Sequence, residues 1–524
     1  MTATTTDRPT DQVAPVTLGT AGTTAADVVA VARHDARVEL APEARERVRA
    51  VRAHIDALAA STTPVYGIST GFGALANTPI PPQKRTRLQK SLVRSHAAGA
   101  GPAVEREVVR ALMFLRAKTL ASGRTGIRLE TLQTLIDVLN AGITPVVHEF
   151  GSLGCSGDLA PLAHCALVLM GEGRATGPDG VERPVPELLA EAGIAPVTLE
   201  EKEGLALING TDGMLGQLVL ALADLTDLFT VADITAALSV EGLLGTDRVF
   251  VPELHEPLRP HPGQVRSAAT MLAVLADSAI VASHRYGDDR VQDAYSLRCA
   301  PQVAGAARDT AAYATQVVER ELAAAIDNPV VLDDGTISSN GNFHGAPVAY
   351  VLDFLAIPVA DVASMAERRT DRMLDPARSH GLPPFLAEDP GTDSGLMIAQ
   401  YTQAGLVSDL KRLAVPASVD SIPSSAMQED HVSMGWHAAR KLRQGVANLR
   451  RVLAIELLAA TRAIALRAPL QPGPAGAAVL ADVTARIGAP GADRFLAPEI
   501  ADLEEYVASG RLLRTVESVV GPLR

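Results

Sequence analysis

Long apolar segments with helical spacing dominate residues 226–467, and they constrain the possible folds more than any other feature of the chain. The chain is rich in alanine and leucine and only 3% aromatic, a composition that favours helices packed on helices. Few strand signals interrupt these residues. We therefore predict a mainly α protein with a central bundle of long helices. The clearest segments are 265–283, 303–325, 346–374 and 434–466.

The composition and the spacing of apolar residues change along the 524 residues and predict four consecutive parts. Residues 1–20 carry many Thr, Asp and Pro without an apolar core, which indicates a disordered tail and not a signal peptide. Residues 21–225 alternate helical runs with glycine-rich loops and are expected to form an N-terminal domain. The helix bundle covers 226–467, and a Pro/Gly-rich break precedes a C-terminal helical cap over 468–524. Helices this apolar usually bury some faces by oligomerising.

Charge and cysteine content exclude several classes of function. A net charge of −13 and a pI near 5.4 leave no basic footprint, so neither nucleic acid nor a membrane is an expected partner. The longest apolar stretches contain charged residues such as Asp353 and Asp361, which is typical of buried helices and not of membrane spans. Three cysteines in so long a chain favour a reducing, cytoplasmic compartment. None has Cys-x-x-Cys spacing and no His-Glu-x-x-His occurs, so we expect no metal.

The segment 150–164 contains Cys155-Ser156-Gly157, a tripeptide that can become its own cofactor. Attack of the Gly157 amide nitrogen on the Cys155 carbonyl carbon would close a five-membered imidazolone within the backbone. Loss of water from Ser156 would then leave an exocyclic methylene, which is a strong electrophile. Glycine supplies the unshielded nitrogen and tolerates the unusual dihedral angles. The alternative interpretation is an ordinary turn or an anion cradle before a helix, although no Gly-Lys-Ser/Thr follows to support a P-loop.

This run resembles the prosthetic-group loop of the histidine and phenylalanine ammonia-lyase family, whose ring is called methylidene-imidazolone (MIO). The resemblance implies a fumarase/aspartase-like helical architecture, an MIO formed autocatalytically from Cys155, Ser156 and Gly157 without an external cofactor, and a homotetramer with shared active sites. The family usually has Ala-Ser-Gly here. Cys155 is a mild departure, because only its carbonyl group reacts.

Two further motifs of the N-terminal part resemble the same family. Tyr66 begins a Gly-rich loop, Tyr-Gly-Ile-Ser-Thr-Gly-Phe-Gly, and corresponds to the family's catalytic acid–base on a mobile loop. Ser95-His96 stands where histidine lyases have Ser-His and where phenylalanine lyases tend to have Phe-Leu. The resemblance therefore places His96 against the substrate ring, which an imidazole can recognise by a hydrogen bond. Taken singly, a tyrosine beside a turn and a histidine in an apolar helix are more often packing residues.

The remaining motifs resemble the family in the same order along the chain. Leu-Ile-Asn-Gly-Thr implies that Asn209 donates a hydrogen bond near the ring oxygen or the substrate amine, although an asparagine here can also simply form an Asx turn or cap a helix. Gln-Asp-Ala-Tyr-Ser-Leu-Arg implies a catalytic Tyr295, a substrate contact from Gln292 and a bidentate clamp from Arg298 on the α-carboxylate. Gly-Asn-Phe-His places Phe343 against the substrate ring.

The run Gln-Glu-Asp-His-Val-Ser-Met at 428–434 favours a particular substrate. It is similar to the histidine lyases, whereas phenylalanine lyases generally lack the glutamate. The resemblance therefore makes Glu429 both a catalytic residue and a ligand for a ring that carries an N–H or a charge. Many family members have Asn where Met427 stands, which affects only the hydrogen bond of that asparagine. Taken alone, a Glu-Asp pair usually marks a solvated helix start.

Together the motifs imply elimination of ammonia from L-histidine to give trans-urocanate. Tyr66 would take a β-proton, Arg298 would hold the carboxylate, and His96 with Glu429 would fix the imidazole. An aminomutase that returns ammonia to the β-carbon, or a tyrosine or phenylalanine ammonia-lyase, remains an alternative. A fumarase-like lyase is disfavoured, because Gln428 and Glu429 replace part of its Gly-Ser-Ser-x-Met-Pro motif. A helical scaffold protein would need none of these motifs.

Overall fold

The computed structural model describes all residues except 1–12, 20–21, 61–69, 72–77, 289 and 524. The predicted mainly α class is confirmed, with helices forming most of the described chain and only short strands. Contacts divide it into two compact units, each assembled from three separate segments. Unit 1 comprises 1–220, 316–352 and 416–440, and unit 2 comprises 221–315, 353–415 and 441–524. The predicted boundaries at 225 and 467 therefore remain a prediction.

Unit 1 is a group of helices interleaved with two- and three-stranded sheets. Strand β1 pairs in parallel with β2, β3 pairs antiparallel with β5, β6 lies between β4 and β7, and β8 pairs with β9. The helices are α1 Ala25–Arg33, α2 Pro42–Ala59, α3 Pro82–His96, α4 Arg106–Ala121, α5 Leu129–Asn140, α6 Leu159–Leu169, α7 Val185–Glu191 and α8 Glu203–Ile208. The strands are β1 Val16–Leu18, β2 Val38–Leu40, β3 Ala100–Ala103, β4 Thr144–Pro145, β5 His148–Phe150, β6 Arg174–Thr176, β7 Glu182–Pro184, β8 Val330–Val331 and β9 Ile337–Ser338.

Local sequence signals explain where the unit 1 helices begin. Thr24 and Asp27 form a capping box, in which each side chain accepts a hydrogen bond from the other residue's backbone N–H. Pro42 occupies the first turn of α2, where a missing N–H costs nothing. Helix α4 is almost completely buried, and its Arg116 side chain donates to the carbonyl oxygens of Asn209 (2.9 Å) and Ile326 (2.8 Å).

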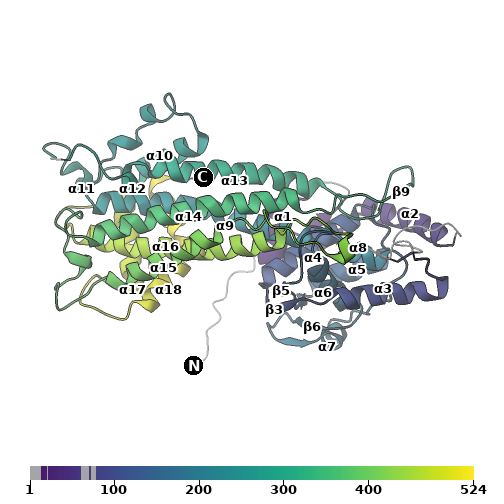
Figure 1. Cartoon of the computed structure of the whole chain (residues 1–524). Helices are drawn as coiled ribbons and strands as arrows, with labels where there is room; N and C mark the ends of the chain where they lie inside the picture. The colour runs from purple at the N-terminus through teal and green to yellow at the C-terminus, as the bar shows by residue number, and fades with distance from the viewer. Residues whose placement is uncertain (1–12, 20–21, 61–69, 72–77, 289, 524) are drawn as a thin grey trace. The chain divides into compact units, whose positions relative to one another are not determined.

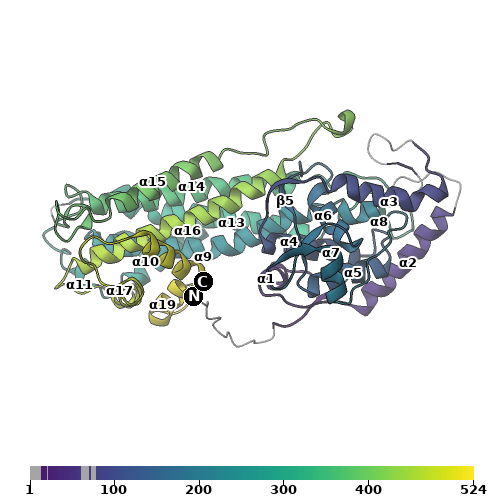
Figure 2. The same ribbon diagram turned by 90° about the horizontal axis from the view of Figure 1, so that it is seen from below.

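Four long helices run through the boundaries between the units, and Figures 1 and 2 both show them lying lengthwise beside one another. They are α9 Asp212–Gly242, α13 Ala300–Ala323, α14 Ala346–Leu374 and α16 Gly435–Ala465. The last two match the predicted segments 346–374 and 434–466. Among the described helices α14 alone is long and apolar enough to cross a bilayer, but 61% of its most apolar window is buried inside the protein, as in a core helix.

Unit 2 adds shorter helices to the long ones, and α10 packs on α17 and α19. The predicted segment 265–283 is interrupted, because Asp277 has a φ of +57° and the Ser278 hydroxyl caps a new helix by accepting from Val281 N. The additional helices are α10 Pro262–Val274, α11 Ala279–Ala282, α12 Tyr295–Arg298, α15 Met397–Leu413, α17 Pro474–Ile487, α18 Ala497–Ala508 and α19 Arg511–Val520. Short 3₁₀ turns are η2 Arg248–Phe250, η3 Pro252–Leu254, η4 Pro384–Leu386 and η5 Ser425–Met427.

Candidate active site

A cavity of about 660 Å³ in unit 1 collects most of the predicted site residues. Its walls come from the end of α3, the loop before α6, the end of α8, and the segments 328–344 and 425–431. The predicted residues that line it are His96, Cys155, Ser156, Asn209, Phe343 and Glu429. Residues that were not singled out as site residues also line it: Leu92, Leu159, Leu205, Ile208, Asn328, Ser339, Asn340, His344, Ser425, Gln428, Asp430 and His431.

The loop that carries the reactive tripeptide is packed directly against Gly210. Gly157 has a φ of +77°, and a Cβ atom at this position would lie 2.0 Å from the Gly210 carbonyl oxygen. The Asp158 N–H donates to that same oxygen at 2.7 Å. A side chain at position 157 is therefore excluded by both backbone conformation and space. Glycine at this position fits the closure of the imidazolone, which needs a sterically unshielded backbone nitrogen.

Asp158 fixes the end of this loop to the start of α9. Its carboxylate accepts from the N–H groups of Gly213 and Met214, each at 2.9 Å, and from the Ser152 hydroxyl at 2.8 Å. The side chain is completely buried, and burial raises the pKa of Asp158 to about 7, against the opposing effect of these hydrogen bonds. Position 158 is thus a structural anchor of the reactive loop.

The Glu429 carboxylate touches both side chains of the tripeptide. Ser156 Oγ donates to Glu429 Oε1 at 3.3 Å, and Cys155 Sγ donates to Glu429 Oε2 at 3.1 Å. Ser424 Oγ adds a second donor to Oε2 at 3.0 Å. Burial, reinforced by Glu429, raises the pKa of Cys155 to about 12, so the sulfur is a protonated thiol at neutral pH.

Glu429 reaches this position from a strained turn. Ser425, Ala426 and Met427 have φ values of +51°, +51° and +68°, a left-handed conformation that side chains disfavour. Paired backbone hydrogen bonds between Ser424 and Glu429, at 2.9 and 3.3 Å, close the turn. No motif or periodicity indicated this strain or the contact of Ser424.

His96, the last residue of α3, offers an acceptor nitrogen to the cavity. Its Nδ1 lies 2.9 Å from the Leu92 carbonyl oxygen and therefore carries the proton, which leaves a lone pair on Nε2 of the neutral ring. Burial lowers the pKa of His96 against the raising effects of Leu92 and the negative charge of Glu429. The ring is therefore neutral at pH 7, and Nε2 can accept an N–H from a ligand.

Asn209, at the C-terminal end of α8, contributes an unsatisfied oxygen. Its Nδ2 donates to the Asn328 carbonyl oxygen at 3.0 Å, whereas the buried Oδ1 has no hydrogen-bond partner. The free group is therefore an acceptor, which suits an N–H of a substrate amine better than the oxygen of a ring.

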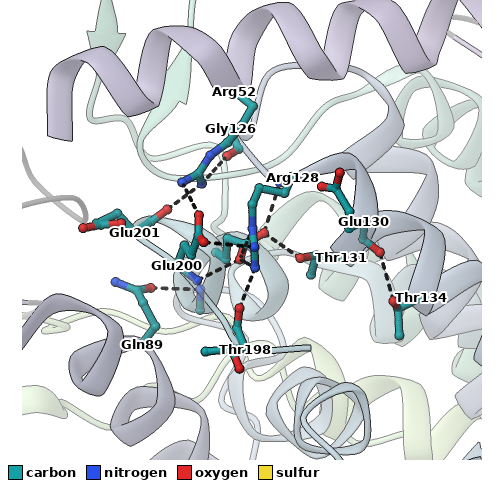
Figure 3. Close-up of polar contacts among 12 residues, drawn as sticks. Arg52, Gln89, Gly126, Arg128, Glu130, Thr131, Thr134, Thr198, Glu200 and Glu201 are labelled. Atoms are coloured by element: carbon teal, nitrogen blue, oxygen red, sulfur yellow. Dashed lines mark hydrogen bonds and ion pairs between the residues drawn. The ribbon is translucent and has the colours of Figure 1, made fainter. Parts of the chain in front are cut away.

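A polar network holds the other end of α8 in place (Figure 3). The buried Glu203 carboxylate accepts from Arg128 Nη2 at 2.7 Å, from Thr131 Oγ1 at 2.7 Å and from Glu200 N at 2.8 Å. Gln89 Oε1 accepts from the next backbone N–H of the helix at 2.9 Å. Since both ends of α8 are fixed, Asn209 is held rigidly at the cavity.

Two of the histidines of the cavity wall, His344 and His431, stack on each other. His431 Nδ1 and His344 Nε2 are 3.2 Å apart, their ring planes differ by 23°, and the ring centroids are 5.3 Å apart. Burial, followed by the proximity of His431, lowers the pKa of His344. The pair links the segment of Phe343 to the segment of Glu429.

Among the described residues, the predicted Gln292, Tyr295 and Arg298 do not line this cavity. Gln292, Tyr295 and Arg298 lie together in unit 2, where Arg298 Nη2 donates to Gln292 Oε1 at 2.7 Å and the guanidinium stands 4.6 Å from the centre of the Tyr295 ring. Tyr295 is 71% exposed. Tyr66 lies outside the described residues. Within the described ranges, no three His, Cys, Asp or Glu side chains are grouped to hold a metal ion.

Comparison with known proteins gives matches along nearly the whole chain. A family profile described as "Aromatic amino acid lyase" matches residues 23–485. Histidine ammonia-lyase of Streptomyces coelicolor is 69% identical over 97% of this chain and 99% of its own length. Histidine ammonia-lyase of Symbiobacterium thermophilum is 49% identical over 95% and 97%.

Solved structures of the same kind share the fold. Histidine ammonia-lyase from Trypanosoma cruzi superposes with a TM-score of 0.89 at 38% identity, over 97% of this chain and 96% of that one. Tyrosine aminomutase from Streptomyces globisporus superposes with a TM-score of 0.90 at 36% identity, over 96% and 98%. The fold is therefore shared by enzymes of both reaction types.

Proposed function

Because the chain belongs to the aromatic amino acid lyase family, we propose that it eliminates ammonia from L-histidine to give trans-urocanate and ammonium, the first step of histidine degradation. The observation that carries the assignment is identity of 49–69% with proteins named histidine ammonia-lyase over at least 95% of this chain. The enzyme is a carbon–nitrogen lyase.

The cavity supports recognition of an imidazole ring. His96 presents an acceptor nitrogen and Glu429 a carboxylate, so an imidazole with an N–H can be held by polar groups of the wall. Phe343 adds an apolar surface for the ring face. Polar sites reject analogues that leave buried groups unpaired, which disfavours phenylalanine here.

We infer that Cys155, Ser156 and Gly157 form the methylidene-imidazolone. The lack of space at Gly157 and its contact with Gly210 support this inference, because a residue without a Cβ leaves the attacking nitrogen unshielded and allows the tight turn. The ring would supply an electrophile that makes the substrate amine a better leaving group. Asn209 Oδ1, which has no partner, would hold the amine by accepting one of its N–H groups.

We propose that residues of two other motifs carry out proton abstraction and carboxylate binding. Tyr66 would remove the β-proton, and Arg298 would clamp the carboxylate with help from Gln292 and Tyr295. Each such positioning contact typically contributes about 10²–10⁴-fold to rate.

We propose a homotetramer with shared active sites. The exposure of Tyr295 supports a contribution from a neighbouring subunit. An apolar hollow of about 750 Å³ on α13 and α14 supports burial against other copies, since Tyr313, Phe354 and Ile357 are 49%, 46% and 56% exposed there. All three cysteines are free, which supports a cytoplasmic location.

One assay tests the substrate and another the reaction type. Purified protein is incubated with L-histidine, L-tyrosine or L-phenylalanine, and the conjugated acid is followed by ultraviolet absorbance. Urocanate from histidine alone supports the proposal, whereas preference for tyrosine or phenylalanine contradicts it. Because a tyrosine aminomutase shares this fold, chromatography for β-amino acids distinguishes a lyase from an aminomutase.

A further inference from the structure

The Glu429 carboxylate has two unequally held oxygens, although the two sides of a carboxylate are chemically identical. Oε2 accepts from Cys155 Sγ at 3.1 Å and from Ser424 Oγ at 3.0 Å. Oε1 accepts from Ser156 Oγ at 3.3 Å, and no other side chain or backbone group of the described residues donates to it. The asymmetry lies inside the cavity wall, so it bears on how the carboxylate can meet a ligand.

Maturation of the tripeptide removes the donor on one side only. Ser156 loses its hydroxyl as water when the exocyclic methylene forms, whereas the Cys155 side chain and Ser424 are unchanged. After that step Oε2 keeps both donors, and Oε1 loses the hydroxyl that it accepts from. The oxygen released in this way lies beside the reactive residue.

We propose that Cys155 and Ser424 are positioning residues that hold Glu429 by Oε2, so that Oε1 is left to accept the ring N–H of an imidazole substrate. The inference rests on the proposed histidine ammonia-lyase function and deepens it. It gives a role to the sulfur of Cys155, which the chemistry of ring closure does not use.

The chemistry of both donors suits this role. Cys155 is 6% exposed and burial keeps it a thiol, so its proton is available for a hydrogen bond to the carboxylate. Ser424 is fixed by the backbone pair that it forms with Glu429, at 2.9 and 3.3 Å. Two donors to the same oxygen of the carboxylate therefore restrict its rotation.

The test measures binding in a protein that cannot turn over. Ser156→Ala removes the hydroxyl and the ring together, and urocanate binding to this variant is measured by calorimetry. In the same background, Cys155→Ala should weaken urocanate binding by roughly 3- to 10-fold, less than the full loss of a hydrogen bond to a charged group because Ser424 still holds Oε2. Cys155→Ser, which restores a donor, should recover most of the affinity. Ser424→Ala should resemble Cys155→Ala.

Cinnamate, which has no ring N–H, is the matched ligand. Its affinity should be the same in all of these variants. Equal loss for urocanate and cinnamate would reduce Cys155 and Ser424 to packing residues and overturn the inference, as would unchanged urocanate binding in Cys155→Ala. If the wild-type enzyme forms no urocanate from histidine, the proposed function fails instead, and the two failures are thereby distinguished.

Discussion

The ion pair between Lys202 and Asp327 offers a sharp test of how the cavity is supported. Lys202 Nζ and Asp327 Oδ2 are 2.6 Å apart, and both side chains are completely buried. The carbonyl oxygen of Asp327 accepts from Asn340 Nδ2 at 3.0 Å. The carbonyl oxygen of the next residue, Asn328, accepts from Asn209 Nδ2. The pair therefore lies directly behind two residues of the cavity wall.

The expected cost of Asp327→Asn follows from this burial. The substitution conserves volume, so no cavity term arises, but it leaves an ammonium group without a counter-charge. Removing one partner of a buried pair typically costs about 3–5 kcal/mol. For a domain of this size, roughly 2 °C is lost per kcal/mol, so the thermal midpoint should fall by about 6–10 °C.

The pH dependence of the stability loss distinguishes an unpaired buried charge from a general disruption of packing. Burial lowers the pKa of Lys202, and Asp327 opposes that effect. In Asp327→Asn the pKa of Lys202 falls further. At pH values between this lowered pKa and the ordinary pKa of lysine, the unfolded chain binds more protons than the folded protein. The free energy of unfolding of the variant therefore rises with pH over this interval. The deficit relative to wild type should therefore shrink between pH 7 and about 10.

Differential scanning calorimetry at several pH values measures this, with Lys202→Met/Asp327→Leu as the control. The double variant removes both charges and should be closer to wild type than either single variant, because no buried charge remains unpaired. A midpoint within about 2 °C of wild type for Asp327→Asn, or a deficit independent of pH, would refute the reasoning.

Three further outcomes are expected. Ser156→Ala should fold and assemble normally but lose the near-ultraviolet band of the ring and several orders of magnitude in activity; wild-type turnover would contradict a self-made cofactor. His96→Phe should raise the Michaelis constant for histidine, and His96→Phe/Glu429→Gln should accept phenylalanine better than either single variant, which steady-state kinetics with both substrates will test. Burial raises the pKa of Asp158 to about 7, so the folded protein holds this proton where the unfolded carboxyl, with a pKa near 3.9, has lost it. Stability should fall as pH rises from about 4 to 7, and Asp158→Asn should flatten this part of a urea-unfolding profile; an unchanged slope would be inconsistent with the buried proton.

Local features determined much of this protein from the sequence alone. The apolar periodicity predicted α14 and α16 to within one or two residues, because a helix depends on residues three and four positions apart. The family was also identifiable from the sequence, because its motifs are short and each is contiguous. The reactive tripeptide needs only neighbouring residues for its chemistry.

Only the tertiary structure decided how these residues are arranged. Glu429 lies more than 270 positions from Cys155, and no periodicity predicts that its two oxygens are held unequally. The break at Asp277 depends on a backbone conformation that the apolar pattern does not record. Long-range hydrogen bonds and burial set these features, because the free energy of each contact depends on surroundings contributed by distant segments of the chain.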